Sequence, residues 1–135
     1  DAPFLDSAYK MVEYDGRPVM KLSSAKVTAP GPKQVFRRPA FDDVIGLRGE
    51  PPPEKGIPLL ETVMRNGQRT RRRPTLAESA TRFAGDLAGL PAAARRIRAP
   101  QAPRAATSAQ LGALTERVRR RIGAQSASAP GSASS

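Results

Sequence analysis

The 135-residue sequence has no cysteine and no histidine. Without cysteine there are no disulfides, thiolate zinc sites or cysteine nucleophiles. Without histidine there is no imidazole acid–base catalysis, imidazole metal ligation or phosphohistidine. No apolar run approaches the roughly 18 residues of a membrane-spanning helix, and no signal peptide is visible. We therefore expect a cytoplasmic protein that makes no use of a membrane.

Large apolar side chains are also scarce, because Leu, Ile, Val and Phe together number 25. A domain of this length can bury roughly two thirds of its unfolded surface, so the supply of apolar residues limits the core more than length does. A low share of large apolar residues, combined with high charge, is close to the composition of disordered chains.

Charge is distributed unequally along the chain, whose net charge is +11. Residues 1–64 hold nine basic and nine acidic side chains, whereas residues 65–135 hold fourteen arginines against three acids. A basic half raises the alternative of a small protein that binds nucleic acid or another polyanion. Aromatic residues are only 4% of the chain, and no known nucleic-acid-binding motif is present. We therefore interpret the arginines as a solvated surface and do not expect a nucleic-acid partner.

The first half predicts short strands joined by turns. Asp15-Gly16 and Asn66-Gly67 each lie between apolar runs, a strong signal for a two-residue hairpin. The expected strands alternate imperfectly and lie at Ala8–Tyr14, Pro18–Leu22, Gln34–Arg37, Asp43–Leu47, Pro58–Met64 and Gln68–Arg72. This spacing favours an antiparallel sheet.

From Thr75 the apolar period becomes helical. Thr75 and Glu78 form a capping box, and the stripe that follows consists of Leu76, Ala80, Phe83, Leu87 and Leu90. Pro91 ends this helix and Gln101–Ala106 forms a Pro/Ala connector.

A second helix is expected to start with a capping box of Thr107 and Gln110. Its apolar residues are Leu111, Leu114, Val118 and Ile122, and Gly123 occupies the expected C-terminal cap. The predicted class is therefore an α+β fragment, with antiparallel strands followed by two helices. Its expected parts are a strand-rich segment (1–73), a helical segment (74–123) and a disordered tail (124–135).

No recognisable catalytic constellation or metal site exists in the sequence. Asp42-Asp43 and Glu50 with Glu54 could suggest paired carboxylates, but adjacent strand residues point to opposite faces, so a turn or strand-edge role is favoured. The loop around Lys26 and Lys33, with its Pro30-Gly31 turn, can present ammonium groups and backbone amides to an anion. A phosphate-binding role and an ordinary surface loop both remain open for it.

The residues of this loop and its surroundings resemble the carboxyl-terminal portion of nicotinate phosphoribosyltransferases. In the first third the matching residues are Asp1-Ala2-Pro3, Tyr9-Lys10, Val12-Glu13, Gly16-Arg17-Pro18-Val19-Met20-Lys21-Leu22-Ser23, Lys26, Thr28, Pro30-Gly31 and Lys33-Gln34-Val35. Farther on they are Pro58-Leu59-Leu60, Val63-Met64-Arg65, Asn66-Gly67 and Thr75-Leu76-Ala77-Glu78. The resemblance extends to about Ile122, with its most specific motifs in the first third.

This resemblance implies an enzyme that converts nicotinate and phosphoribosyl pyrophosphate to nicotinate mononucleotide, with magnesium and coupled ATP hydrolysis. It implies an irregular α/β barrel joined to an open-faced β domain, working as a homodimer. Anion contacts are expected from Lys26, Thr28 and Lys33, with Asp1 beside the family's phosphate loop.

The chain departs from the family pattern in three ways. It lacks the histidine that the family phosphorylates, and the glycine-containing phosphate loop would precede Asp1, so we expect the 135-residue chain to be inactive by itself. The family more often carries a tyrosine and a short apolar strand where this chain has Ala102–Ala106, which leaves the docking of the last helix open.

Overall fold

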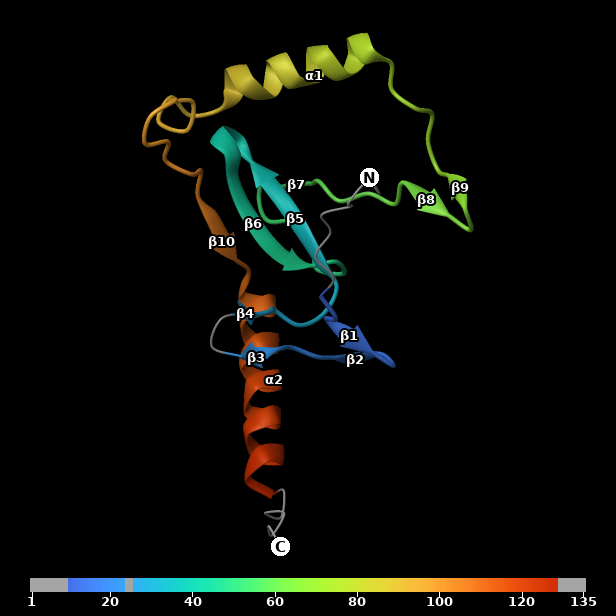
Figure 1. Cartoon of the computed structure of the whole chain (residues 1–135), viewed down its shortest axis with the longest axis vertical. Coiled ribbons are helices and arrows are strands. Elements are labelled where there is room, and N and C mark those ends of the chain that lie inside the picture. Colours follow the sequence, from blue (N-terminus) through green and yellow to red (C-terminus); the bar gives the residue numbers. More distant parts are fainter. Residues whose placement is uncertain (1–9, 24–25, 129–135) are drawn as a thin grey trace, which may run out of the picture. The chain divides into compact units, whose positions relative to one another are not determined.

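The computed structural model describes residues 10–23 and 26–128, and the chain divides into two compact units. Unit one comprises Asp1–Pro32 together with Ala109–Ser135, and unit two comprises Lys33–Ser108. Each unit is described by itself below (Figure 1).

Unit one contains two short antiparallel hairpins. The first pairs β1 (Glu13–Tyr14) with β2 (Arg17–Pro18) around Asp15 and Gly16, which both have positive φ angles of 48° and 67°. Two consecutive left-handed residues define the turn that the Asp-Gly pair predicted, so this hairpin is confirmed, with strands shorter than expected. The second hairpin pairs β3 (Leu22–Ser23) with β4 (Lys26–Val27).

The helix of unit one, α2 (Ala109–Ser128), differs from its prediction at both ends. Thr107 lies in a strand, so the predicted Thr107/Gln110 capping box is wrong, and the helix begins at Ala109. Gly123 does not adopt the positive φ that a C-terminal cap requires. Residues 124–128 therefore continue the helix instead of starting a disordered tail, and residues 129–135 lie outside the described part of the chain.

The predicted apolar face of α2 is confirmed in its first half. Leu111, Leu114 and Val118 are all buried, with Leu111 only 1% exposed. Their spacing of three and four residues places them on one side of the helix. Arg121, from a later turn, donates a hydrogen bond of 2.6 Å to the carbonyl oxygen of Pro18 in the first hairpin.

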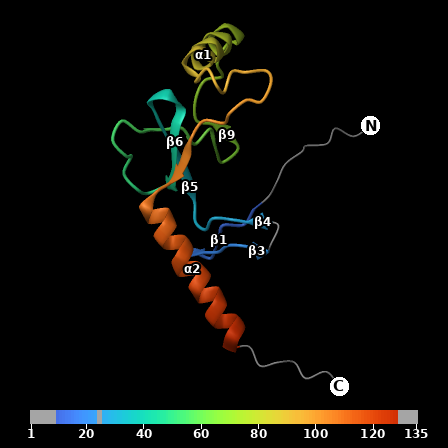
Figure 2. The same cartoon turned by 90° about the vertical axis from the view of Figure 1, so that its left-hand side faces the viewer.

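Unit two is built on a four-stranded sheet in the order β10-β6-β5-β7 (Figure 1), and Figure 2 shows its central strands β5 and β6 after a 90° turn. Its centre is the antiparallel pair β5 (Lys33–Arg38) and β6 (Asp42–Leu47), joined by a 3-10 turn at Pro39–Phe41. β7 (Ile57–Pro58) pairs antiparallel with β5. Phe36 and Val44 form the buried apolar pair of the central strands.

The edge strand β10 (Ala105–Thr107) corrects two expectations. It runs parallel to β6, so the sheet is mixed and not purely antiparallel. It also overlaps the Pro/Ala stretch expected to be a connector. The Asp43 amide donates to the Arg104 carbonyl and the Ser108 amide to the Ile45 carbonyl, at 3.0 and 2.9 Å. Alanine has a weak strand propensity, so backbone pairing with β6 is what stabilises this strand.

A separate hairpin of unit two joins β8 (Met64–Arg65) and β9 (Gln68–Arg69). Its turn residues Asn66 and Gly67 have φ angles of 49° and 75°, again both left-handed. The second hairpin predicted from the sequence is therefore confirmed, also with short strands.

The predicted capping box of α1 (Leu76–Gly89) is present in full. The Thr75 hydroxyl accepts from the Glu78 amide at 3.2 Å, and the Glu78 carboxylate accepts from the Thr75 amide at 2.7 Å. The helix ends before Pro91, as predicted. Its apolar stripe does not form part of a core, because none of the fourteen residues of α1 is buried.

We predict that the start of α1 loses stability in strong acid. Hydrogen bonds from the Arg72 guanidinium, and then from Thr75, lower the pKa of Glu78 from its ordinary 4.5 to about 2. Because the folded-state pKa is the lower one, this stabilisation is complete above about pH 4.5 and is lost as the pH falls toward 2. An NMR titration of the Glu78 carboxyl should show the low midpoint. Arg72→Ala should raise that midpoint more than Thr75→Ala, and a wild-type midpoint near 4.5 would contradict the prediction.

Candidate functional site

The Pro30-Gly31 turn of the candidate loop is held by backbone hydrogen bonds within unit one. Gly31 has a φ angle of 76°, a conformation that favours glycine. Its amide donates to the carbonyl oxygen of Val12 at 2.8 Å, and the Val19 amide donates to the same oxygen at 3.0 Å. The turn therefore joins three stretches of the family-like sequence, so a requirement of backbone shape explains this glycine.

Thr28 is the first predicted site residue whose side chain is described. It is only 8% exposed, and its hydroxyl oxygen accepts a hydrogen bond of 2.8 Å from the Lys21 amide. The Thr28 amide in turn donates to the Lys21 carbonyl at 3.2 Å. This side chain stabilises the β3–β4 hairpin. Its hydroxyl oxygen is occupied as an acceptor, which leaves the hydroxyl proton as the group that could meet an anion.

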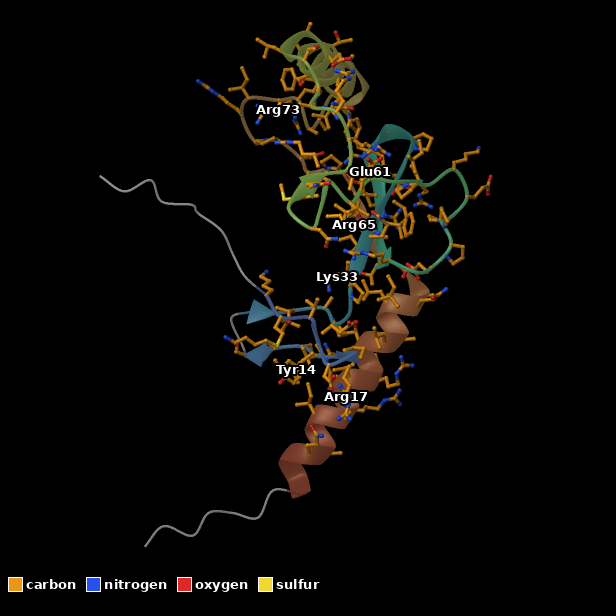
Figure 3. The ribbon with its side chains drawn as sticks, turned by 90° about the vertical axis from the view of Figure 1, so that its right-hand side faces the viewer. Tyr14, Arg17, Lys33, Glu61, Arg65 and Arg73 are labelled. Carbon is orange, nitrogen blue, oxygen red and sulfur yellow. The ribbon has the colours of Figure 1, made fainter. Side chains whose placement is uncertain are left out.

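Lys33 is the other predicted residue with a described side chain. It opens β5 in unit two and is half-buried (Figure 3). Burial lowers the pKa of its ammonium group, because the charged form loses hydration.

The two remaining predicted residues are not placed at the level of their side chains. Lys26 begins β4 in unit one, and only its backbone is described. Asp1 lies outside the described residues. Thr28 belongs to unit one and Lys33 to unit two. That the four residues form one anion-binding site therefore remains a prediction.

Gln34, next to Lys33, has a structural role that the sequence did not reveal. It is 7% exposed, and its amide nitrogen donates to the Leu60 carbonyl at 2.9 Å. Its side-chain oxygen accepts from the amides of Leu60 and Val35 at 2.8 and 2.9 Å. Gln34 and Leu60 belong to two separate family-like motifs, so these hydrogen bonds connect the two motifs.

The adjacent carboxylates Asp42 and Asp43 each pair with their own arginine across the β5–β6 register. Asp43 accepts two hydrogen bonds from Arg37, at 2.9 and 2.8 Å, and Asp42 accepts one from Arg38 at 2.5 Å. The hydrogen bonds with Asp43 raise the pKa of Arg37; burial opposes this rise and the nearby carboxylate charges add to it. The two carboxylates therefore form separate ion pairs instead of a catalytic pair.

The other carboxylates considered from the sequence are also structural or exposed. Glu50 accepts from the Leu47 amide at 2.9 Å and from the Ser108 hydroxyl at 3.0 Å. Glu54 lies near Lys55, with 4.0 Å between the charged atoms, and both side chains are largely exposed.

A hollow of about 310 Å³ lies beside the β5–β6 turn and was not predicted from the sequence. Its wall includes Arg37, whose guanidinium carbon lies 4.3 Å from the centre of the Phe41 ring. The other ionisable side chains that line it are Arg38, Lys55 and Asp86. Both arginines are already paired with aspartates, so the hollow lacks the excess positive charge of a phosphate site.

Within residues 10–23 and 26–128 no cluster of three acidic side chains could hold a metal ion. The same residues include no helix with the length and apolar character to cross a membrane.

Comparison with known proteins identifies phosphoribosyltransferases as relatives. No protein-family model matches the chain. The nicotinate phosphoribosyltransferase pncB2 of Mycobacterium tuberculosis is 51% identical over 81 residues, which cover 56% of this chain and 17% of that protein. Nicotinate phosphoribosyltransferase of Bos taurus is 33% identical over 144 residues, covering 86% of this chain and 27% of the bovine protein.

A solved structure agrees with these sequences. The crystal structure of human nicotinic acid phosphoribosyltransferase matches with a TM-score of 0.71 and 28% identity, covering 83% of this chain and 26% of that one. The chain is thus a homologue, over most of its length, of nicotinate phosphoribosyltransferases, and the resemblance found in its sequence is confirmed. It spans about a quarter of the length of the bovine and human relatives.

We predict that Arg37→Lys destabilises unit two, because lysine keeps the charge but loses the two-pronged hydrogen bond to Asp43. The expected loss is about 1.5 kcal/mol in the free energy of unfolding, the lower end of the range for a hydrogen bond to a charged group, because the pair is partly exposed. Urea unfolding of the whole chain measures it, with the exposed Arg95→Lys as the matched control. Equal unfolding midpoints for the two variants would contradict the prediction.

Proposed function

We propose that this chain is the carboxyl-terminal part of a nicotinate phosphoribosyltransferase. The complete enzyme would join nicotinate to the ribose phosphate of phosphoribosyl pyrophosphate, giving nicotinate mononucleotide and pyrophosphate for NAD synthesis. The likeness to the human enzyme across 83% of the chain is the observation that carries the proposal. The 51% identity to the mycobacterial enzyme supports it from sequence alone.

The catalytic residues would lie in the part of the enzyme that this chain does not span. The sequence has no histidine to accept a phosphoryl group from ATP, and its described residues contain no acidic cluster that fits magnesium. In this proposal magnesium and ATP are held elsewhere in the longer polypeptide. A cytoplasmic location and a homodimeric assembly complete the proposal on the strength of the family resemblance.

Within this chain, Lys33 is our first choice for a contact with substrate phosphate. A half-buried ammonium group attracts an anion more strongly than a fully hydrated one, because the lower local dielectric screens the charge less. Lys26, the Thr28 hydroxyl and Asp1 complete the proposed set. Thr28 would act through its hydroxyl proton, since its oxygen already accepts from the Lys21 amide.

Three of the fourteen arginines in residues 65–135, the basis of the polyanion-binding alternative, form ion pairs with carboxylates in the described part of the chain. Arg71 is paired with Glu61, Arg72 with Glu78 and Arg119 with Glu116. Pairing with carboxylates reduces the charge that these side chains could offer to nucleic-acid phosphates.

The 135-residue chain alone is expected to form no nicotinate mononucleotide. A polypeptide extended toward its amino terminus, in the same reading frame, to the length of the relatives should form it from nicotinate and phosphoribosyl pyrophosphate. Chromatographic detection of the product tests both statements. Turnover by the short chain would refute the assignment of catalysis to the other part, and an inactive long protein would count against the enzyme assignment.

In the longer protein, Lys33→Ala is expected to raise the KM for phosphoribosyl pyrophosphate several-fold, because an ammonium contact to its phosphates is lost. The KM for nicotinate should change little. Lys55→Ala is the matched control, since Lys55 is an exposed lysine of the same unit. Steady-state kinetics with each substrate varied in turn measures the effect, and equal KM values in the two variants would remove Lys33 from the proposed contacts.

A further inference from the structure

Helix α1 presents an apolar stripe to solvent. Leu76 is 88% exposed, Phe83 68% and Leu87 45%. Ala80 lies on the same face, since these positions recur every three or four residues. A continuous apolar face of this kind, on a helix with no buried residue, indicates a surface that is meant to be covered.

The sheet of unit two does not cover this stripe. The helix approaches the sheet through Asp86 and Gly89, which line the hollow that also contains Phe41 and Arg37. The charge of Asp86 acts on Arg37 across this hollow. At 3.6 residues per turn, Asp86 and Gly89 lie to one side of the stripe. The helix therefore turns a polar edge toward its own sheet, the reverse of an amphipathic helix that covers a sheet.

The stability of α1 also indicates that its apolar face packs against another surface. A helix of fourteen residues has the length at which an isolated helix is marginal in water, and most helical stability in proteins comes from packing an apolar face. The capping box satisfies amides at one end only. Burial of Leu76, Phe83 and Leu87 would supply the missing contribution.

The size of the face decides between two occupants. The stripe consists of four residues, Leu76, Ala80, Phe83 and Leu87, on one face of a fourteen-residue helix. A stable interface between separate proteins buries about 800 Å² and uses roughly 20–30 residues on each partner. The stripe alone is too small to hold a second copy, whereas a surface of the same polypeptide carries no association cost.

We propose that α1 is a docking helix whose stripe packs on an apolar surface of the part of the longer enzyme that this chain does not span. This inference rests on the proposed function. The relatives supply the space for such a surface, because the chain covers only 27% of the bovine protein and 26% of the human one. The stripe is then an internal surface of the complete enzyme.

A tryptophan placed on the stripe tests this docking. The chain contains no tryptophan, so Phe83→Trp introduces a single fluorescent reporter in a conservative exchange. Arg82→Trp, on the polar side of the same helix, is the matched control. Acrylamide quenching is compared between the 135-residue chain and the longer polypeptide, in which any other tryptophan is replaced by phenylalanine.

The expected result is a several-fold lower quenching constant for Phe83→Trp in the longer polypeptide, with Arg82→Trp equally quenched in both. Hydrogen exchange of the proteins without either substitution provides a second measurement, in which the amides of α1 should gain protection in the longer polypeptide. Unchanged quenching and unchanged exchange would overturn the inference. So would protection that appears in the 135-residue chain as its concentration rises, because the occupant would then be a second copy.

These outcomes separate the inference from the proposed function. A longer polypeptide that makes nicotinate mononucleotide while α1 stays exposed would disprove the docking and leave the function intact. One that covers α1 but makes no nicotinate mononucleotide would disprove the function and support the docking.

Discussion

The antiparallel pairing of β5 with β6 is the interaction on which unit two depends. Among the described strands, β7 pairs with β5 and β10 pairs with β6, so both edge strands depend on the central pair. Two ion pairs, Arg37 with Asp43 and Arg38 with Asp42, lie in register across it. A shift of one residue would separate both pairs and place Phe36 and Val44 on opposite faces of the sheet.

Several residues of the family-like motifs make hydrogen bonds that hold the backbone in its folded shape. The Val12 carbonyl receives the amides of both Val19 and Gly31, and the Gln34 carboxamide pairs with the backbone of Leu60. Each bond connects stretches that are separate motifs in the sequence. A motif shared with an enzyme family can therefore reflect the shape of the chain.

The scarcity of large apolar residues and the exposure of α1 have a common explanation. A chain with few such residues would be expected to bury the ones it has, yet Leu76 and Phe83 remain largely in solvent. That arrangement fits a piece whose apolar surface is completed elsewhere, in accord with relatives about four times its length. The arginine excess of the second half is compatible with this reading, since several arginines pair with carboxylates on the surface.

The features that the sequence alone determined are local. Asp15-Gly16 and Asn66-Gly67 formed the predicted turns, and Thr75 with Glu78 formed the predicted cap. In each case the residues that interact lie within four positions of one another, so their chemistry suffices. The family resemblance was likewise evident from the sequence, whereas the hollow beside Arg37 was not, because its walls come from distant parts of the chain.

Tertiary structure decided what depends on distant partners. Strand β10 exists because β6 offers free backbone groups to an alanine-rich segment with little strand propensity of its own. Helix α2 passes Gly123 because nothing there imposes a left-handed turn, and glycine by itself only permits one. The sequence correctly predicted that one face of α1 is apolar, but the spacing of apolar residues does not show what packs against that face. Which surface covers that face depends on the geometry of the folded chain and of the polypeptide around it.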